Sequence, residues 1–380
     1  MSDPSFIGGA HHLTPMATLF SSYRLKDVTF RNRIAASPMC QYRASEGLPT
    51  DWHAPHYAAL ARGGAGLVVV EATAVSPEGR ITPGCLGLWS DEHAEALRPV
   101  VEAIKAAGAV PGIQIGHAGR KASAQRPWEG DDHIPESDSC AWQPIAPSAE
   151  PFGAYLPRTP QEMTLEDIAR VKADFVSAAI RARDIGMEFL MLHFAHGYLA
   201  QSFLSPWSNQ RTDEYGGSTE NRWRFMLETL EAVRAVWPQH LPLCARLGML
   251  EFDGKDEETL AESIELVKRM KAIGLDFIDV SMGFSTPAAQ IPWGPAMMRG
   301  ISKRVLEETG LPGATTWNIH TPTIAEELLN EGAADLVMIG RPLLANPHWP
   351  YAAAKELGVD KPSWTLPASY AHWLERYHYS

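Results

Sequence analysis

Short apolar runs recur along the chain, and most of them follow a glycine that ends a helical segment. The stretches LARGGAGLVVV, KAIGLDFIDV and LNEGAADLVMI show this order. A glycine suits the left-handed residue just past a helix, and runs this short and continuous are typical of buried parallel strands. The pattern therefore predicts eight strands that alternate with helices, at residues 33–40, 67–75, 110–116, 189–195, 241–247, 275–281, 313–318 and 335–340.

The segments between the predicted strands have the apolar period of amphipathic helices. One face is formed by Leu97, Val100, Val101 and Ile104, and another by Leu260, Ile264 and Val267. Each helix is expected to bury this face. Residues 164–167 and 259–262 resemble capping boxes, so we expect Thr164 and Thr259 to start two of the helices.

Eight strand–helix units favour an α/β fold with a single (β/α)8 TIM barrel; an open doubly wound sheet is the alternative. The segment YRLKDVTFRN predicts a β-hairpin that turns at Lys26 and Asp27 and closes the N-terminal end of the barrel. Long loops after strands three and four, at 117–163 and 197–220, predict a lid rather than a second domain. The expected divisions are an N-terminal tail (1–16), the barrel (17–363) and an aromatic C-terminal extension (364–380).

Composition and charge narrow the class of protein. The chain has 33 Lys and Arg and 45 Asp and Glu, which gives a net charge of −12. This charge argues against nucleic acid or an anionic membrane as a partner. No stretch approaches the ~20 apolar residues of a membrane span, and no signal-like segment begins the chain, so we expect a cytoplasmic location. The four cysteines form no C-x-x-C pair, which argues against a zinc ribbon, an iron–sulfur cluster or a disulfide framework.

Polar and aromatic residues gather where the predicted strands end. In a parallel barrel these ends form one rim, and the loops that leave them build the site. A hydrogen bond at the end of an element explains any one of these side chains, but together they favour a ligand site. They are Cys40, Tyr42, Glu71 to Ala74, Gln114, His117, His193, His196, Tyr198, Arg246, Trp317, Gly340 and Arg341.

The stretch LMLHFAHGYLAQSFLSP contains His193, His196 and Tyr198 at the end of a strand. A metal site, a structural role and the binding of a small molecule are three interpretations. We expect no metal, because no Asp or Glu lies beside the histidines, and we keep a metal-dependent barrel hydrolase that uses both histidines as the alternative. Two neutral imidazoles can each donate an N–H to a carbonyl or nitro oxygen, and the tyrosine can supply a proton.

Other motifs limit the class of enzyme. The chain has no G-x-S-x-G hydrolase motif and no G-x-G-x-x-G in a strand–turn–helix unit, so a nicotinamide would share the pocket of the other reactants. The stretch VMIGRPLLANP offers backbone N–H groups and the Arg341 guanidinium to a phosphate. A flavin- or ligand-binding protein without enzymatic activity is a third alternative.

These motifs resemble those of the old yellow enzyme family of FMN-dependent ene reductases, in particular its xenobiotic reductase A-like bacterial branch. The resemblance covers about residues 17–377 and is most specific at SPMCQY (37–42), GIQIGHAGRKAS (112–123), HFAHGYLAQSFLSPWSNQRTDEYGGSTENRWRF (193–225) and IGRPLLANP (339–347). It implies an enzyme that binds FMN non-covalently, oxidises NADPH or NADH, and reduces the C=C bond of α,β-unsaturated carbonyl, nitro or related compounds.

The resemblance also implies which residues hold the flavin. The Cys40 thiol would lie near its reactive edge, and Arg246 near N1 and O2. Asn318 departs from the family pattern, because related sequences have glycine there, but asparagine also tolerates left-handed geometry. The full set is Ser37, Pro38, Met39, Cys40, Ala72, Gln114, Arg246, Asn318, Gly340 and Arg341.

On the substrate side, the resemblance implies that His193 and His196 donate hydrogen bonds to the electron-withdrawing oxygen of the substrate. Tyr198 would protonate the α carbon as flavin N5 delivers hydride to the β carbon. Tyr42 and Trp317 would line this side of the pocket.

The C-terminal extension is rich in aromatic residues, including Trp364, Tyr370 and Trp373. Packing against its own barrel is one interpretation. The resemblance implies another, in which Trp373 reaches the site of a neighbouring subunit, so we expect a homodimer.

Overall fold

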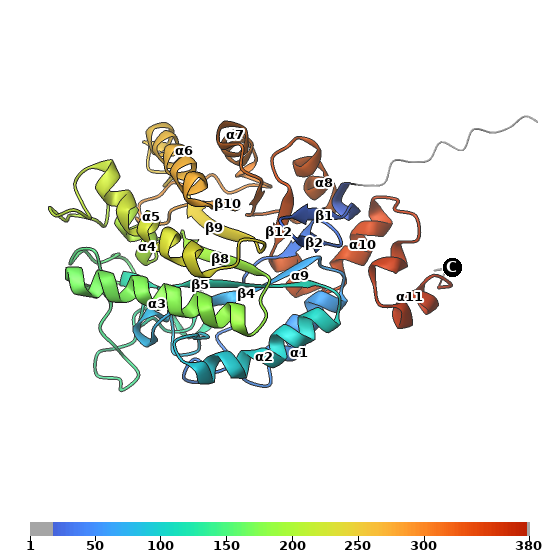
Figure 1. Ribbon diagram of the computed structural model, residues 1–380, viewed down its shortest axis with the longest axis horizontal. Helices are drawn as coiled ribbons and strands as arrows, with labels where there is room; N and C mark the ends of the chain where they lie inside the picture. The colour runs from blue at the N-terminus through green and yellow to red at the C-terminus, as the bar shows by residue number, and fades with distance from the viewer. Residues whose placement is uncertain (1–17, 378–380) are drawn as a thin grey trace, which may run out of the picture.

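Eight parallel strands close into a barrel in the computed structural model, which describes residues 18–377 (Figure 1). Each strand pairs with the strand that follows it in the barrel sequence, and the last pairs with the first. The predicted TIM barrel is confirmed, and the open sheet is wrong. The strands are β3 (Ile34–Ala36), β4 (Leu67–Ala74), β5 (Val110–Gly116), β8 (Phe189–Phe194), β9 (Leu243–Gly248), β10 (Phe277–Ser281), β11 (Gly313–Thr315) and β12 (Leu336–Ile339).

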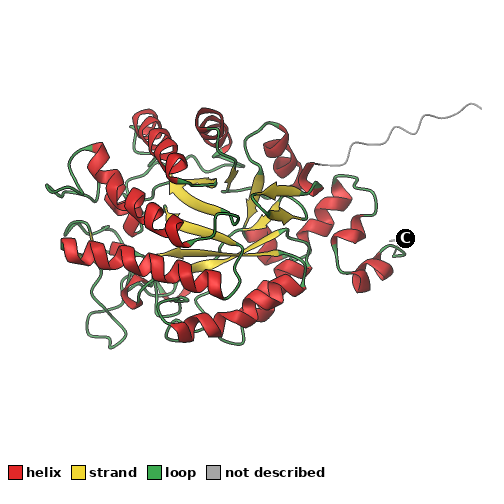
Figure 2. Ribbon diagram, viewed as in Figure 1, coloured by secondary structure: helices red, strands yellow, loops and turns green. Residues whose placement is uncertain are grey.

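Helices surround the barrel and cover the outer faces of its strands (Figure 2). The longer ones are α1 (His53–Arg62), α2 (Asp91–Ala106), α3 (Leu165–Asp184), α5 (Thr219–Val236), α6 (Asp256–Ile273), α7 (Arg299–Thr309), α8 (Pro322–Asn330) and α10 (Trp349–Glu356). The apolar faces predicted for α2 and α6 are buried. Among residues 18–377, none of the helices is both long and apolar enough to cross a membrane.

One of the two predicted helix starts is wrong. Thr164 caps α3, and its hydroxyl accepts a hydrogen bond from the Asp167 N–H, as the capping box predicts. By contrast, α6 begins at Asp256, and Thr259 lies inside its first turn, where its hydroxyl donates to the Lys255 carbonyl. Residues 256–258 are all acidic, and negative charge in the first turn of a helix is favourable, so the helix begins earlier.

The predicted hairpin closes one end of the barrel. Its strands, β1 (Tyr23–Leu25) and β2 (Val28–Phe30), pair antiparallel around the expected turn. Phe30 is fully buried and packs edge-on against Phe189 on the inside of β8. Apolar side chains from the strands and the hairpin therefore fill the barrel interior as one cluster, which is the usual packed core of this fold.

The two long loops lie at the other end, where the strands leave the barrel. Residues 117–163 contain two short helical turns, η3 (Gly119–Lys121) and η4 (Pro127–Glu129), and two short strands, β6 (Ile145–Ala146) and β7 (Gln161–Glu162). The buried Arg120 ties this segment together, because its guanidinium donates to the carbonyls of Glu150 and Ser285. The second loop holds α4 (Leu199–Leu204).

The C-terminal extension forms η5 (Pro362–Thr365) and α11 (Ala368–Leu374), which lies beyond α10 at the edge of the molecule (Figure 1). Leu366 and Ala371 are buried, but Trp364 and Trp373 are largely exposed. The extension therefore docks on its own chain only in part. The N-terminal tail expected at 1–16 lies outside the described residues.

Candidate functional site

The strand ends enclose a cavity of about 610 Å³ at one end of the barrel. It lies where the strands leave the barrel, which is the end at which barrel enzymes carry their active sites. Nine of the predicted site residues line it together: Ser37, Pro38, Met39, His196, Arg246, Trp317, Asn318, Gly340 and Arg341. A much smaller space of about 20 Å³ is lined by Ala72, His193 and Tyr198 among others.

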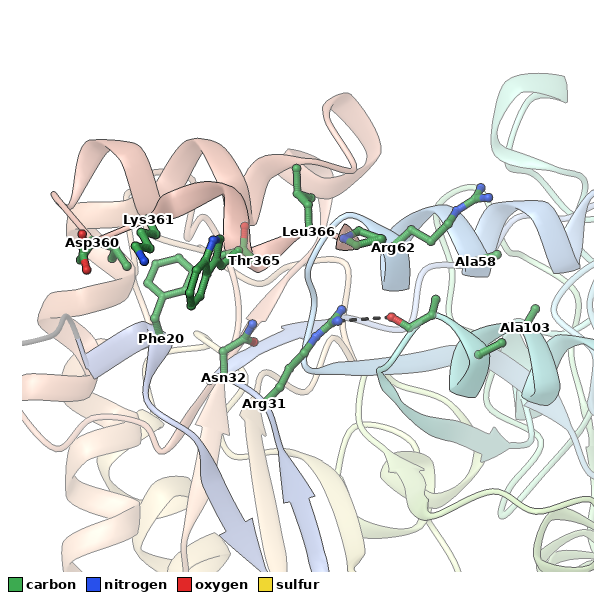
Figure 3. Close-up of a pocket in the computed structure, with 15 residues that line it drawn as sticks. Phe20, Arg31, Asn32, Ala58, Arg62, Ala103, Asp360, Lys361, Thr365 and Leu366 are labelled. Carbon is green, nitrogen blue, oxygen red and sulfur yellow. Dashed lines mark hydrogen bonds between the residues drawn. The ribbon is translucent and has the colours of Figure 1, made fainter. Parts of the chain in front are cut away.

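A second large cavity, of about 690 Å³, lies at the opposite end (Figure 3). Its walls come from the ends of α1 and α2, from η5, and from Arg31 and Asn32, which precede β3. Arg31 is held by the carbonyls of Ala65 and Ala107. Because strands begin at this end, where conserved chemistry is not normally placed in barrels, we do not assign the active site to it.

Arg246 is fixed at the base of the first cavity by a buried ion pair. Its Nε donates to Oδ2 of Asp279 (2.6 Å), and its Nη2 donates to Oγ of Ser37 (3.0 Å). The parallel register places it between His193 on β8 and Asp279 on β10. A buried cation of this kind requires such a partner, so Asp279, which sequence reasoning missed, is part of the site.

His193, His196 and Tyr198 form one cluster of rings. The ring centroids of the histidines are 4.8 Å apart, and that of Tyr198 lies 5.0 Å from His193. Burial lowers the pKa of both imidazoles well below the usual range, and the nearby Arg246 adds to the effect. Burial raises the pKa of the Tyr198 phenol well above its usual range. At neutral pH the cluster therefore presents two uncharged imidazoles and a protonated phenol.

Two further side chains, Ser281 and Lys121, support this cluster and were not identified from the sequence. Oγ of Ser281, at the end of β10, lies 2.8 Å from Nε2 of His196 and accepts a hydrogen bond from Nε1 of Trp317 (2.9 Å). Lys121 is buried, and its Nζ donates to the carbonyls of His196 (2.8 Å) and Phe284 (2.7 Å). A lysine in a surface-like GRKAS segment gives no sign that its ammonium is buried.

Left-handed backbone shapes both turns of the site. His196 and Gly197 have φ values of 64° and 68°, and a Cβ on Gly197 would lie 2.3 Å from the Phe284 carbonyl oxygen. Only glycine fits that close approach. Trp317 and Asn318 also have positive φ, of 73° and 55°. The expectation that Asn318 can adopt the left-handed conformation is confirmed.

Cys40 and Tyr42 lie beside a buried carboxyl group. Burial raises the pKa of the Cys40 thiol well above its usual range, so this thiol is neutral. Glu71, within β4, is fully buried and accepts hydrogen bonds from the Tyr57 hydroxyl (2.9 Å) and the Gln41 N–H (2.9 Å). Glu71 therefore fixes the backbone next to Cys40.

Four of the predicted site residues line neither of the two spaces at the barrel mouth: Cys40, Tyr42, Gln114 and Trp373. Gln114 is buried on β5, and among the described residues its amide has one hydrogen-bond partner, the Met191 thioether sulfur (3.1 Å), which is a weak acceptor. Trp373 on α11 is 70% exposed and lines neither space at the mouth of its own barrel. A single chain therefore does not bring Trp373 to the site.

The ligand sets do not support a metal-dependent hydrolase. In the part of the chain that the structure describes, no group of three or more His, Cys, Asp or Glu side chains is arranged to hold a metal ion. Nε2 of His196 is engaged with Ser281.

The buried Glu71 predicts a pH-dependent loss of stability. Burial raises its pKa from 4.5 to about 7, so between these values the folded protein keeps a proton that the unfolded chain has lost. The free energy of unfolding should fall by about 3 kcal/mol as the pH rises through this window. Glu71→Gln should lack this fall when urea unfolding is compared at pH 5 and pH 8. The control is Glu95→Gln, at an exposed carboxylate; equal pH dependence in all three proteins would contradict the assignment.

Comparison with known sequences identifies the family. The model of the NADH:flavin oxidoreductase / NADH oxidase family matches residues 18–360. NADPH dehydrogenase of Geobacillus thermodenitrificans is 44% identical over 343 residues, which cover 90% of this chain and 95% of that protein. NADPH dehydrogenase of Bacillus subtilis is 40% identical over 347 residues, which cover 91% and 96%.

Solved structures agree with this assignment. The old yellow enzyme homologue from Zymomonas mobilis has a TM-score of 0.74 and 28% identity, and the match covers 89% of this chain and 93% of that one. Morphinone reductase in complex with tetrahydroNAD has a TM-score of 0.73 and 26% identity, and the match covers 93% and 96%. The chain therefore belongs to the NADH:flavin oxidoreductase / NADH oxidase family, and it is an FMN-dependent NADPH oxidoreductase of the old yellow enzyme type.

Proposed function

We propose that the protein reduces the activated C=C bond of α,β-unsaturated carbonyl, nitro or related compounds at the expense of NADPH or NADH. The observation that carries the proposal is the cluster of two uncharged imidazoles and a protonated tyrosine at the barrel mouth, next to a cavity lined by cations. This set of groups suits a substrate that gains negative charge on an oxygen and a proton on a carbon.

The residues around the cavity fit FMN by their chemistry. A volume of about 610 Å³ lies within the range of pockets that bind cofactors. Arg341 supplies positive charge for the phosphate, and Arg246 supplies it for the pyrimidine edge of the ring. The buried Gln114 amide, whose one partner among the described residues is a thioether, is suited to hydrogen bonds with that edge. Ser37, Pro38, Met39, Cys40, Ala72, Asn318 and Gly340 complete the proposed contacts.

The chemistry that FMN supplies when bound is hydride transfer, from the reduced nicotinamide and then to the β carbon of the substrate. His193 and His196 donate N–H groups to the activating oxygen of the substrate. Negative charge grows on this oxygen as the hydride arrives, so fixed donors stabilise the transition state more than the ground state. Alkenes without an activating group should therefore not react.

Tyr198 holds the proton that the α carbon receives. Its raised pKa keeps the phenol protonated at neutral pH, and its ring packs edge-on against His193. On the substrate side, Tyr42 and Trp317 are joined by Phe284 and Trp293, which pack with Trp317 at ring distances of 5.5 and 5.8 Å. This aromatic wall favours flat, conjugated substrates.

We also propose a homodimer in the cytoplasm. Trp364, Tyr370 and Trp373 expose much of their surface on the extension, which is unusual for aromatic side chains without a partner. The proposed contact places Trp373 at the substrate side of the second subunit. The four cysteines are all free thiols, as expected in a reducing compartment.

Replacement of the proton donor tests the proposed reaction. Tyr198→Phe in the FMN-loaded protein should slow reoxidation by 2-cyclohexen-1-one by about 10²- to 10⁴-fold, the usual contribution of a general acid. Reduction by NADPH should change much less, because that step needs no proton from Tyr198. Stopped-flow absorbance of the flavin measures both steps. Tyr215→Phe is the control, since that buried hydroxyl bonds Glu228 away from the mouth; equal effects on both steps, or a wild-type protein that gains no flavin absorbance from FMN, would refute the proposal.

The exposed tryptophan of the extension tests the dimer. Trp373→Ala removes little packing within its own chain, so the fold should be unaffected. If the side chain contacts a second subunit, Trp373→Ala should raise the dissociation constant of the dimer, as measured by sedimentation velocity over a range of protein concentrations. The KM for the enone should also rise severalfold. Leu165→Ala, at a comparably exposed apolar side chain on α3, is the control. An unchanged dissociation constant and KM would reject this role.

A further inference from the structure

Ser281 makes two contacts that together restrict where its hydroxyl hydrogen points. Its Oγ lies 2.9 Å from Nε1 of Trp317 and 2.8 Å from Nε2 of His196. The indole N–H is a donor and has no acceptor lone pair. Oγ of Ser281 must therefore be the acceptor in its bond with Trp317, and its own hydrogen remains to be placed.

The hydroxyl hydrogen has one available acceptor among the described residues. Ser281 is fully buried, and no third hydrogen-bond partner of its Oγ is found in residues 18–377. If His196 donated to Ser281 instead, the hydroxyl hydrogen would be buried without an acceptor, which is unfavourable. Donation from Ser281 to Nε2 of His196 satisfies all three groups.

We propose that Ser281 is a positioning residue that fixes the tautomer of His196, so that the imidazole carries its proton on Nδ1. A neutral imidazole has one N–H, and the nitrogen that accepts a hydrogen bond cannot also carry the proton. In the described part of the chain, Nδ1 of His196 has no hydrogen-bond partner. This N–H is therefore the donor that the ring offers to a ligand in the cavity that His196 lines.

His193 carries its proton on the other nitrogen. The backbone N–H of Ala195 points at Nδ1 of His193 across a long hydrogen bond of 3.4 Å, so this nitrogen is the acceptor and the proton lies on Nε2. The two rings are nearly perpendicular, at 86°. The two histidines are therefore opposite tautomers. The backbone N–H of Ala195 fixes that of His193, and Ser281, held by Trp317, fixes that of His196. Each ring keeps one N–H for a ligand.

The consequence for catalysis rests on the proposed function, because the substrate oxygen is the acceptor that both N–H groups serve. Without the Ser281 hydroxyl, His196 would sample both tautomers and would often face the ligand with a lone pair. A lone pair repels a carbonyl oxygen, so the transition state would lose one of its two donors.

The tautomer is measured directly by nitrogen NMR of the flavin-loaded protein with 15N-labelled histidine. His196→Gln identifies the signals of this ring by their loss. A protonated Nδ1 and an unprotonated Nε2 are expected, and the opposite assignment overturns the proposal. This readout needs no turnover and no Ser281 variant, so it decides the inference even if the proposed reaction or a variant fails.

Ser281 variants then test the cause. Ser281→Ala should convert His196 to a mixture of tautomers and lower kcat/KM for 2-cyclohexen-1-one by about tenfold, the size of one lost hydrogen bond. Ser302→Ala is the matched control, because its buried hydroxyl donates to the Ala333 carbonyl on the outside of the barrel. An unaltered His196 tautomer in Ser281→Ala, or a loss of activity equal to that of Ser302→Ala, overturns the proposal. A wild-type protein without enone turnover would refute the proposed function and leave the tautomer result standing.

Discussion

The closure of eight parallel strands is the constraint on which the rest of the structure depends. It brings the carboxyl end of every strand to one rim, so residues as distant in sequence as Ser37 and Arg246 meet in a hydrogen bond of 3.0 Å. The register of β8, β9 and β10 places His193, Arg246 and Asp279 in one row across the rim. A shift by one residue would turn these side chains out of the barrel, so strand register and site geometry are specified together.

Burial then determines the protonation of the site. The imidazoles are kept uncharged and the tyrosine protonated because burial disfavours the charged form of each ring. Burial of ionisable groups also lowers the stability of the folded protein, and Glu71 and Lys121 are two such side chains enclosed by protein. Both side chains bind backbone groups of the loops at the barrel mouth. Their burial lowers stability, and their hydrogen bonds hold the active site in a defined geometry.

Much of the fold and the rim could be predicted from the sequence. Apolar runs after glycines locate the strands, because a strand buried on both faces has no other pattern, and polar residues at the ends of those runs locate the rim. The sequence also identifies His193, His196 and Tyr198, since three such side chains in six residues have few other uses at the end of a strand. The family resemblance extends this to most of the residues that line the cavity.

The supporting residues could not be found in this way, because their roles depend on contacts between distant segments. Ser281 looks like an ordinary strand residue until it is seen between His196 and Trp317. Lys121 reads as a solvent-facing charge, yet its ammonium bridges two loops. The predicted start of α6 at Thr259 is wrong because the three acidic residues just before it also favour the first turn of a helix, and the helix begins with them. The role of Trp373 depends on a second chain, which one sequence does not place.

The central claim is that a flavin lies across the barrel mouth with both imidazoles directed at the ligand above it. A crystal structure of the FMN-loaded protein with a non-reactive reduced nicotinamide analogue tests this most directly. The account predicts the flavin ring in the cavity beside Arg246, with Nε2 of His193 and Nδ1 of His196 within hydrogen-bond distance of the carboxamide oxygen of the analogue. A flavin bound elsewhere, or imidazoles that turn away from the ligand, would contradict it.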